Sequence, residues 1–243
     1  MTNRALLNNI DHQNLKIIAR HAAEFGDNVN QALIFPTEFA DIQREYPILF
    51  RKNASGAFQA VALLGLDRDE NLFLDDAGWR ARYVPAVQTR GPFSIALQRK
   101  EDPVAAPEPM IHVDLDDPRV GETEGEPVFL PHGGNSPYLE RVSAALRRIH
   151  QGAELEKPMF AAFEDAGVIA PVRLEIKLSE TEQYNVVDYY NISESALREL
   201  DGAGLERLNR AGFLQAAFSV VSSLGNVSRL IELKNRKRAQ QPV

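Results

Sequence analysis

The sequence contains no cysteine, and this absence excludes several classes of chemistry. Without thiolates the chain forms no disulfide, no Cys-ligated zinc site and no iron–sulfur cluster, and it cannot use a cysteine nucleophile. The Gly-x-Ser-x-Gly motif of serine hydrolases is also missing. A catalytic site would therefore have to be assembled from His, acidic or hydroxyl side chains.

Long apolar segments are missing as well. Residues 1–25 contain no uninterrupted apolar stretch of signal-peptide length. No later run approaches the ~20 apolar residues that a membrane-spanning helix requires. We therefore expect a cytoplasmic protein that is not inserted in a membrane.

The chain also lacks an excess of positively charged residues. The chain has 27 Lys and Arg against 34 Asp and Glu, a net charge of −7. This balance disfavours nucleic acid as a partner. The basic run Lys234–Arg238 ends an expected helix, where cations are favourable in any case. Apolar residues make up 44% of the 243 residues, enough for the core of one large or two small domains.

The first hundred residues favour strands. Apolar segments at 47–52 and 57–64 flank the turn Asn53–Gly56 and predict a β-hairpin. We expect Phe50, Phe58, Val61 and Leu63 in its core. Thr37 is predicted to cap a short helix that carries Phe39 and Ile42. Further short strands are predicted at 14–19, 31–35 and 71–74.

The remaining residues favour helices. Ser136 and Pro137 mark a helix start, and Gly152 marks its end; a second short helix is predicted at 158–166. Ser193 opens another helix. The stripe Leu214, Phe218, Val221, Leu224, Val227 and Ile231 predicts one amphipathic helix over Phe213–Arg238, packed on the domain or on a second copy in a homo-oligomer. Strands are predicted at 110–115, 127–130 and 172–178.

The predicted fold class is α+β, with an N-terminal hairpin-centred, mostly antiparallel sheet followed by a helix-rich C-terminal part. Three prolines in the nine residues Glu101–Pro109 predict a linker. This linker would separate a β-rich part, residues 1–100, from an α+β part, residues 110–243. One continuous domain over residues 1–235 is the alternative.

Several short motifs, each present once, follow one another along the chain in a recognisable order. They are YPILFR at Tyr46–Arg51, ALLGL at Ala62–Leu66, ENLF at Glu70–Phe73, Trp79, YVP at Tyr83–Pro85, and Arg90, Pro92 and Phe93. DLDDPR at Asp114–Arg119 and SLGN at Ser223–Asn226 follow. The chain resembles the SapC family in these motifs. The resemblance implies a bacterial protein associated with the handling of surface or outer-membrane proteins, and it implies no catalytic residues.

The tripeptide His112-Val113-Asp114 has the His-x-Asp spacing of non-haem iron oxygenases. In a strand, residues two apart point the same way, so both side chains can converge, with His132 or His150 as a third ligand. So short a motif often arises by chance, and we predict no metal and no cofactor. The alternative is an oxygenase-like or peptide-tailoring enzyme, or its partner subunit, that uses His112, Asp114 and His132.

The loop before the helix start is a second candidate. His132, Gly133, Gly134 and Ser136 lie where backbone amides at a helix N-terminus can bind an anion. No Gly-Lys-Ser/Thr follows, so the loop is not a phosphate-binding P-loop, and a plain capping loop is favoured. The resemblance to the SapC family implies a phenylalanine and an acidic-glycine turn before the helix, whereas this chain departs from it with Phe129 followed by Leu-Pro-His-Gly-Gly.

Trp79, Arg82, Tyr83 and Arg90 are the strongest candidates for partner binding. Trp, Tyr and Arg dominate interface energetics, and these four lie in a segment rich in turn residues. Core packing of the single Trp is the competing interpretation. We predict a non-enzymatic accessory or adaptor protein that binds a protein or peptide partner in a cell-envelope or surface-protein handling system. The adaptor is favoured over the enzyme.

Overall fold

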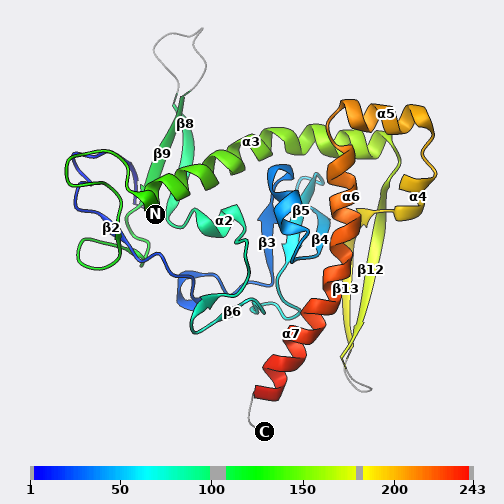
Figure 1. Ribbon diagram of the computed structural model, residues 1–243, viewed down its shortest axis with the longest axis horizontal. Helices are drawn as coiled ribbons and strands as arrows, with labels where there is room; N and C mark the ends of the chain where they lie inside the picture. The colour runs from blue at the N-terminus through cyan, green and yellow to red at the C-terminus, as the bar shows by residue number, and fades with distance from the viewer. Residues whose placement is uncertain (1–2, 99–107, 179–182, 241–243) are drawn as a thin grey trace. The chain divides into compact units, whose positions relative to one another are not determined.

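The computed structural model describes residues 3–98, 108–178 and 183–240 (Figure 1). The chain divides into two compact units, and each unit is built from two separate segments. Unit 1 comprises Met1–His21 and Ala86–His150, and unit 2 comprises Ala22–Pro85 and Gln151–Val243. Helices and antiparallel sheets occur together, as the predicted α+β class requires. Residues 101–107 of the predicted linker lie outside the described residues.

Unit 1 contains two three-stranded antiparallel sheets. One has the order β1-β9-β8, formed by Arg4–Leu6, Glu108–Asp114 and Phe93–Gln98. The other has the order β10-β2-β11, formed by Val120–Gly121, Lys16–Ile17 and Glu126–Pro127. Helix α2 (Ala86–Thr89) and the first half of α3 (Pro137–Asp165) also belong to this unit. Its core is apolar and includes Ile17, Phe93, Val113, Leu139 and Val142.

Unit 2 is built on a five-stranded antiparallel sheet of order β12-β13-β4-β5-β3. The predicted hairpin is confirmed as β4 (Ile48–Lys52) and β5 (Phe58–Leu63). Asn53 closes its turn, because the Asn53 Oδ1 accepts from the amides of Ser55 and Ala57. Phe50, Val61 and Leu63 are buried, and Phe58 packs half-buried against them. Strand β3 is Gln31–Ile34, and β6 (Leu74–Asp75) pairs with β7 (Gly78–Trp79).

The C-terminal strands complete this N-terminal sheet. Strand β12 (Ile169–Lys177) covers the predicted strand at 172–178, whereas β13 (Gln183–Ile192) was not predicted. A register shift opposite Val172 and Leu174 interrupts the regular pairing of β13, and Asp188 in this part of the strand adopts a φ of 66°. Residue Asn191 ties β13 to β4, since its Nδ2 donates to the carbonyl oxygen of Ile48 at 2.8 Å.

Helices pack on the sheet of unit 2. The second half of α3 places Phe160 edge-on against Phe50, with ring centroids 4.9 Å apart, and α6 packs on β13 and β4 (Figure 1). Ser193 caps α4, as predicted. Thr37 lies inside a 3-10 helix and caps no helix; Glu38 accepts from the amide of Phe35 instead. The bounds are η1 Ala23–Phe25, η2 Pro36–Glu38, α1 Phe39–Ile42, α4 Glu194–Arg198, α5 Gly202–Arg210, α6 Leu214–Ser223, η3 Leu224–Asn226 and α7 Val227–Gln240.

The prediction that Gly152 ends a helix is wrong, because Gly152 lies inside α3, a helix of 29 residues. A Cβ at Gly152 would lie 2.4 Å from the Cβ of Phe35 and 2.7 Å from the Oγ1 of Thr37. The glycine therefore serves close packing. Pro158 also lies inside this helix rather than at the start of a second one.

The prediction of a single helix over Phe213–Arg238 is also wrong, because η3 interrupts it. The predicted stripe also differs from the face that is buried, already within α6. Phe218 of the predicted stripe is 51% exposed, whereas Ala217, Val220 and Leu230 are fully buried. No helix of the described residues is long and apolar enough to cross a membrane.

Candidate functional site

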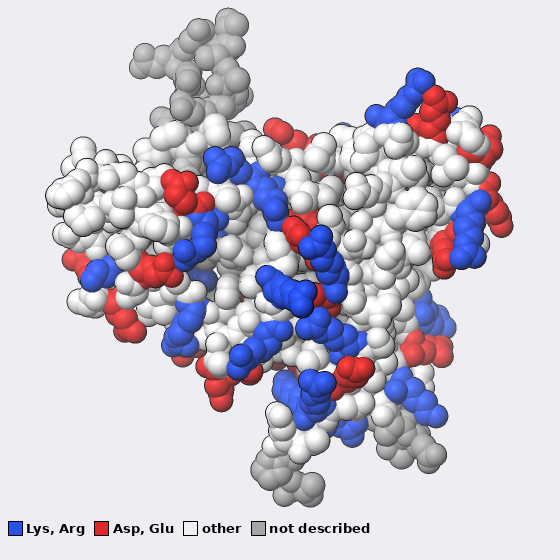
Figure 2. Space-filling view, in the orientation of Figure 1, with Lys and Arg blue, Asp and Glu red and all other residues white. Residues whose placement is uncertain are grey.

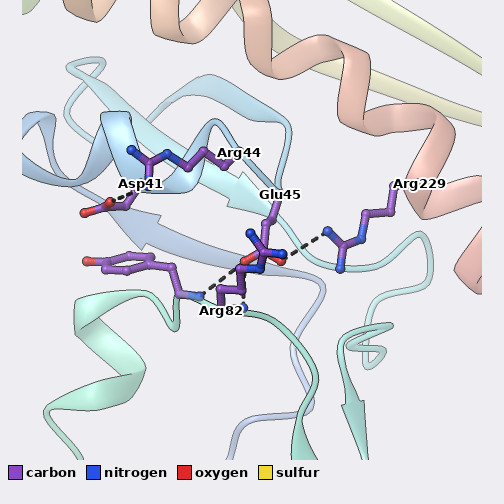
Figure 3. A pocket seen from close by; sticks show the side chains of 6 residues that line it. Asp41, Arg44, Glu45, Arg82 and Arg229 are labelled. Atoms are coloured by element: carbon purple, nitrogen blue, oxygen red, sulfur yellow. Dashed lines mark hydrogen bonds and ion pairs between the residues drawn. The ribbon is translucent and has the colours of Figure 1, made fainter.

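A cavity of about 460 Å³ in unit 2 contains three arginines. We call it the arginine pocket. Its lining residues come from three separate parts of the chain (Figure 3): Asp41, Arg44, Glu45, Arg82, Tyr83 and Arg229. Asp41 belongs to α1, Arg44 and Glu45 follow it, Arg82 and Tyr83 follow β7, and Arg229 lies in the first turn of α7.

Glu45 organises the pocket. Its side chain is 9% exposed, and its Oε2 accepts from the amides of Arg82 at 2.7 Å and Tyr83 at 3.2 Å. Its Oε1 accepts from Arg229 Nη1 at 3.1 Å. One nearly buried carboxylate thus holds the loop after β7 and the start of α7 together, and a charge at this depth is stable only because all these donors face it.

The three guanidinium groups are not equally engaged. Figure 3 shows Arg44 turned toward Asp41, but the ion pair is long at 3.7 Å and the Arg44 side chain is 72% exposed. Arg229 is shared with Glu45. The exposed guanidinium of Arg82 has no hydrogen bond or ion pair to any other described residue. Three cations against two carboxylates leave one net positive charge, which favours an anionic ligand.

A buried polar network is connected to the arginine pocket through Tyr83. Tyr46 is fully buried; its hydroxyl donates to the carbonyl oxygen of Tyr83 at 2.6 Å and accepts from Trp79 Nε1 at 2.8 Å. The hydroxyl of Tyr83 donates to Glu38 Oε1 at 2.9 Å. Burial raises the pKa of Tyr46, so its hydroxyl stays protonated. Trp79 is partly buried against the core and holds Tyr46, in agreement with a structural role.

The motif Ser223–Asn226 positions α7 at the pocket. Ser223 Oγ accepts from the amide of Ile48 at 2.9 Å. Asn226 Nδ2 donates to the carbonyl oxygens of Gln43 at 2.8 Å and Tyr46 at 3.2 Å. Arg229 follows three residues later, on the next turn of the helix, and reaches Glu45. The residues of η3 therefore help to place Arg229 in the arginine pocket.

Lys and Arg side chains gather over α7 in Figure 2. Lys234, the first residue of the basic run, is not one of the exposed cations. It is 7% exposed, and its Nζ donates to Asp67 Oδ2 at 2.5 Å and Glu70 Oε1 at 2.8 Å. Burial lowers the pKa of Lys234, but the hydrogen bonds to Asp67 and Glu70 outweigh it, and the pKa is raised. This residue anchors the helix.

Arg90, the fourth predicted partner-binding residue, does not line the arginine pocket. It belongs to unit 1, where its Nη1 donates to the carbonyl oxygen of Phe93 at 2.6 Å. Of the predicted set, the pocket contains Arg82 and Tyr83. Glu45 and Arg229 of the pocket were not predicted from the sequence. Their proximity to the motifs beginning at Tyr46 and Ser223 was the available signal.

The loop His132–Ser136 forms a capping turn in unit 1. Ser136 Oγ accepts from the amide of Leu139 at 3.2 Å, which confirms the predicted helix cap. The amides of Gly133 and Ser136 donate to the carbonyl oxygens of Leu130 and Val128. Gly133 and Gly134 have φ values of 80° and 85°, which explains the two glycines. These amides are used within the turn, and His132 is exposed.

His112 and Asp114 lie two residues apart in β9, opposite Leu6 and Arg4 of β1. The intervening Val113 is fully buried, so the two polar side chains share the other face of the strand. His132 lies in the exposed capping turn. Across the described ranges, no group of three or more His, Asp or Glu is placed to hold a metal ion.

Comparison with known protein families identifies one match. The SapC family matches residues 7–230, nearly the whole chain, and the protein belongs to this family. Comparisons with curated proteins and with solved structures find no match.

Proposed function

We propose that this member of the SapC family is a non-enzymatic adaptor that binds an acidic segment of a protein or peptide partner in the arginine pocket. The observation that carries the proposal is the exposed guanidinium of Arg82, which has no partner among the described residues and lines the same pocket as Arg44 and Arg229 (Figure 3). A role in a cell-envelope or surface-protein handling system is what the family resemblance adds.

The chemistry of the pocket suits a carboxylate. A planar guanidinium donates two parallel hydrogen bonds to a carboxylate, and Arg82 has this capacity unused. Glu45 holds the backbone of Arg82 and the side chain of Arg229 before any ligand arrives, so less ordering is needed on binding. Because Arg44 and Arg82 are exposed, binding should weaken as salt screens their charges.

The test is fluorescence anisotropy with a dye-labelled acidic peptide rich in Asp and Glu and a matched peptide with Asn and Gln. We expect the acidic peptide to bind at least about tenfold more tightly, the equivalent of ~1.4 kcal/mol. Arg82→Ala should remove most of this difference. Arg80→Ala is the matched control, because Arg80 lies in the same segment but pairs with Asp75 outside the pocket.

Equal binding of both peptides, or unchanged binding by Arg82→Ala, would contradict the proposal. Competition with small anions separates the possible ligands. Displacement of the peptide by inorganic phosphate but not by acetate at equal ionic strength would assign the pocket to phosphate groups and overturn the assignment to acidic side chains.

A further inference from the structure

A second cavity in unit 2 has the opposite chemical character. This groove of about 360 Å³ lies between the tip of the β4–β5 hairpin and α3. Phe58 of β5 and Phe160 of α3 line it, and the ionisable residues in its lining are Glu156, Lys157 and Glu164. We call it the hairpin groove. Two carboxylates against one ammonium group make its lining negative, so an occupant of positive charge is favoured.

Glu156 is the unusual residue of the groove. Its Oε1 is buried and has no hydrogen-bond partner in the described part of the chain. Burial raises the pKa of the Glu156 carboxyl, and the nearby amide of Ala60 opposes this rise only in part. A buried carboxylate oxygen without a donor is destabilising, and a cation bound beside Glu156 in the groove would compensate the charge of this carboxylate.

The aromatic side chains beside Glu156 already hold a cation. The rings of Phe58 and Phe160 stack with their centroids 5.4 Å apart at an interplanar angle of 28°. Lys52 Nζ lies 5.1 Å from the centroid of Phe58 and 5.4 Å from that of Tyr190. The rings of this cluster therefore accept a cation in the folded protein, and Lys52, which does not line the groove, occupies the side of Phe58 that faces Tyr190.

We propose that the hairpin groove binds the side chain of an arginine from a peptide partner, with the guanidinium at Glu156 and its alkyl stem against Phe58 and Phe160. A guanidinium suits this lining better than an ammonium group because it is planar and weakly hydrated and its hydrogen-bond geometry matches a carboxylate. This site is independent of the arginine pocket, and neither proposal requires the other.

The test is a nuclear magnetic resonance titration of the full chain with the capped peptide Gly-Arg-Gly. Two matched peptides carry citrulline, which has nearly the same shape without the charge, or lysine. We expect amide shifts at Ala57, Phe58 and Phe160, and affinity for the citrulline peptide lower by about tenfold or more, as loss of a charge-assisted hydrogen bond predicts. The carboxyl resonance of Glu156 should report a lower pKa when the arginine peptide is bound.

Glu156→Gln keeps the shape of the side chain and removes its charge, so it should fold normally and lose about tenfold in affinity for the arginine peptide. Glu175→Gln is the matched control, because Glu175 is exposed on β12 and does not line the groove. Unchanged binding by Glu156→Gln, or equal binding of the citrulline peptide, would overturn the proposal. Equal binding of the lysine peptide would overturn the choice of guanidinium. Arg82→Ala should leave this titration unchanged, which separates it from the test of the arginine pocket.

Discussion

The side-chain amide of Asn226 donates a hydrogen bond to the carbonyl oxygen of Gln43 at 2.8 Å, although 183 residues separate them in the chain. The same amide reaches the carbonyl oxygen of Tyr46. These contacts fix the start of α7 against the turn that carries Glu45. The position of Arg229 in the arginine pocket therefore depends on an asparagine that does not line it.

Asn226→Ala should destabilise the fold and loosen the position of Arg229 in the arginine pocket. Two carbonyl oxygens lose their donor, which predicts a fall in the free energy of unfolding of about 1–3 kcal/mol. Urea denaturation followed by circular dichroism measures this change. Asn209→Ala on the exposed face of α5 is the control and should stay within about 0.5 kcal/mol of wild type. A variant as stable as the control would show that these hydrogen bonds do not hold α7.

Glu45→Gln should change ligand binding in the arginine pocket, whereas Glu45→Ala should change the stability of the fold. The Gln oxygen can still accept from the amides of Arg82 and Tyr83, while the loss of negative charge frees Arg229 for a ligand. We expect Glu45→Gln to bind the acidic peptide several-fold more tightly at low salt. Glu45→Ala leaves both amides without an acceptor and should unfold more easily by about 1–3 kcal/mol. Weaker binding by Glu45→Gln, in a folded protein, would argue against an anion site.

Lys234→Met should make stability less dependent on acid pH. The hydrogen bond from Lys234 lowers the pKa of Asp67. Burial raises the pKa of Glu70, but hydrogen bonds from Lys234, Lys237 and the amide of Leu66 outweigh it and lower that pKa as well. Carboxyls with lowered pKa stabilise the fold above their ordinary values of about 4, and this contribution disappears as the pH falls through their folded-state pKa.

At pH 7 we expect Lys234→Met to lose about 3 kcal/mol in the free energy of unfolding, because the buried Glu70 then keeps one of its two lysine partners, Lys237. The difference from wild type should shrink on acidification below about pH 4. Arg236→Met, at an exposed position of α7, is the control. A difference that is constant from pH 7 to pH 3 would mean that Lys234 acts through packing alone.

Two helix glycines should respond oppositely to alanine. Gly152→Ala places a Cβ 2.4 Å from the Cβ of Phe35, so the helix and the segment before η2 must separate; a loss of about 1–3 kcal/mol is expected. A Cβ at Gly225 meets no atom within 4 Å, so Gly225→Ala should be neutral or stabilising by up to about 1 kcal/mol. Thermal denaturation of the pair distinguishes a packing glycine from a replaceable one, and equal melting temperatures would contradict the contact at Phe35.

Local signals in the sequence determined the parts of the fold that depend on neighbouring residues. The β4–β5 hairpin follows from two apolar segments around Asn53, and the caps at Ser136 and Ser193 follow from hydroxyl side chains before helical periodicity. The prediction of Arg82 and Tyr83 rested on residue type and on their position in a segment rich in turn residues, and both line the arginine pocket. The SapC motifs were sufficient to identify the family.

Only the tertiary structure decided which distant residues meet. Strand β13 joins β4 through the single register pair Tyr190 and Phe50, which no local pattern encodes. Gly152 resembles a helix end in the sequence, and only the contact with Phe35 shows that it allows close packing inside a helix. Glu45 and Arg229 lie 184 residues apart, and each alone resembles an ordinary surface charge. Periodicity and capping act over a few residues, whereas a buried carboxylate needs donors from wherever the chain can supply them, so the pocket emerges only when the sheet and α7 are in place.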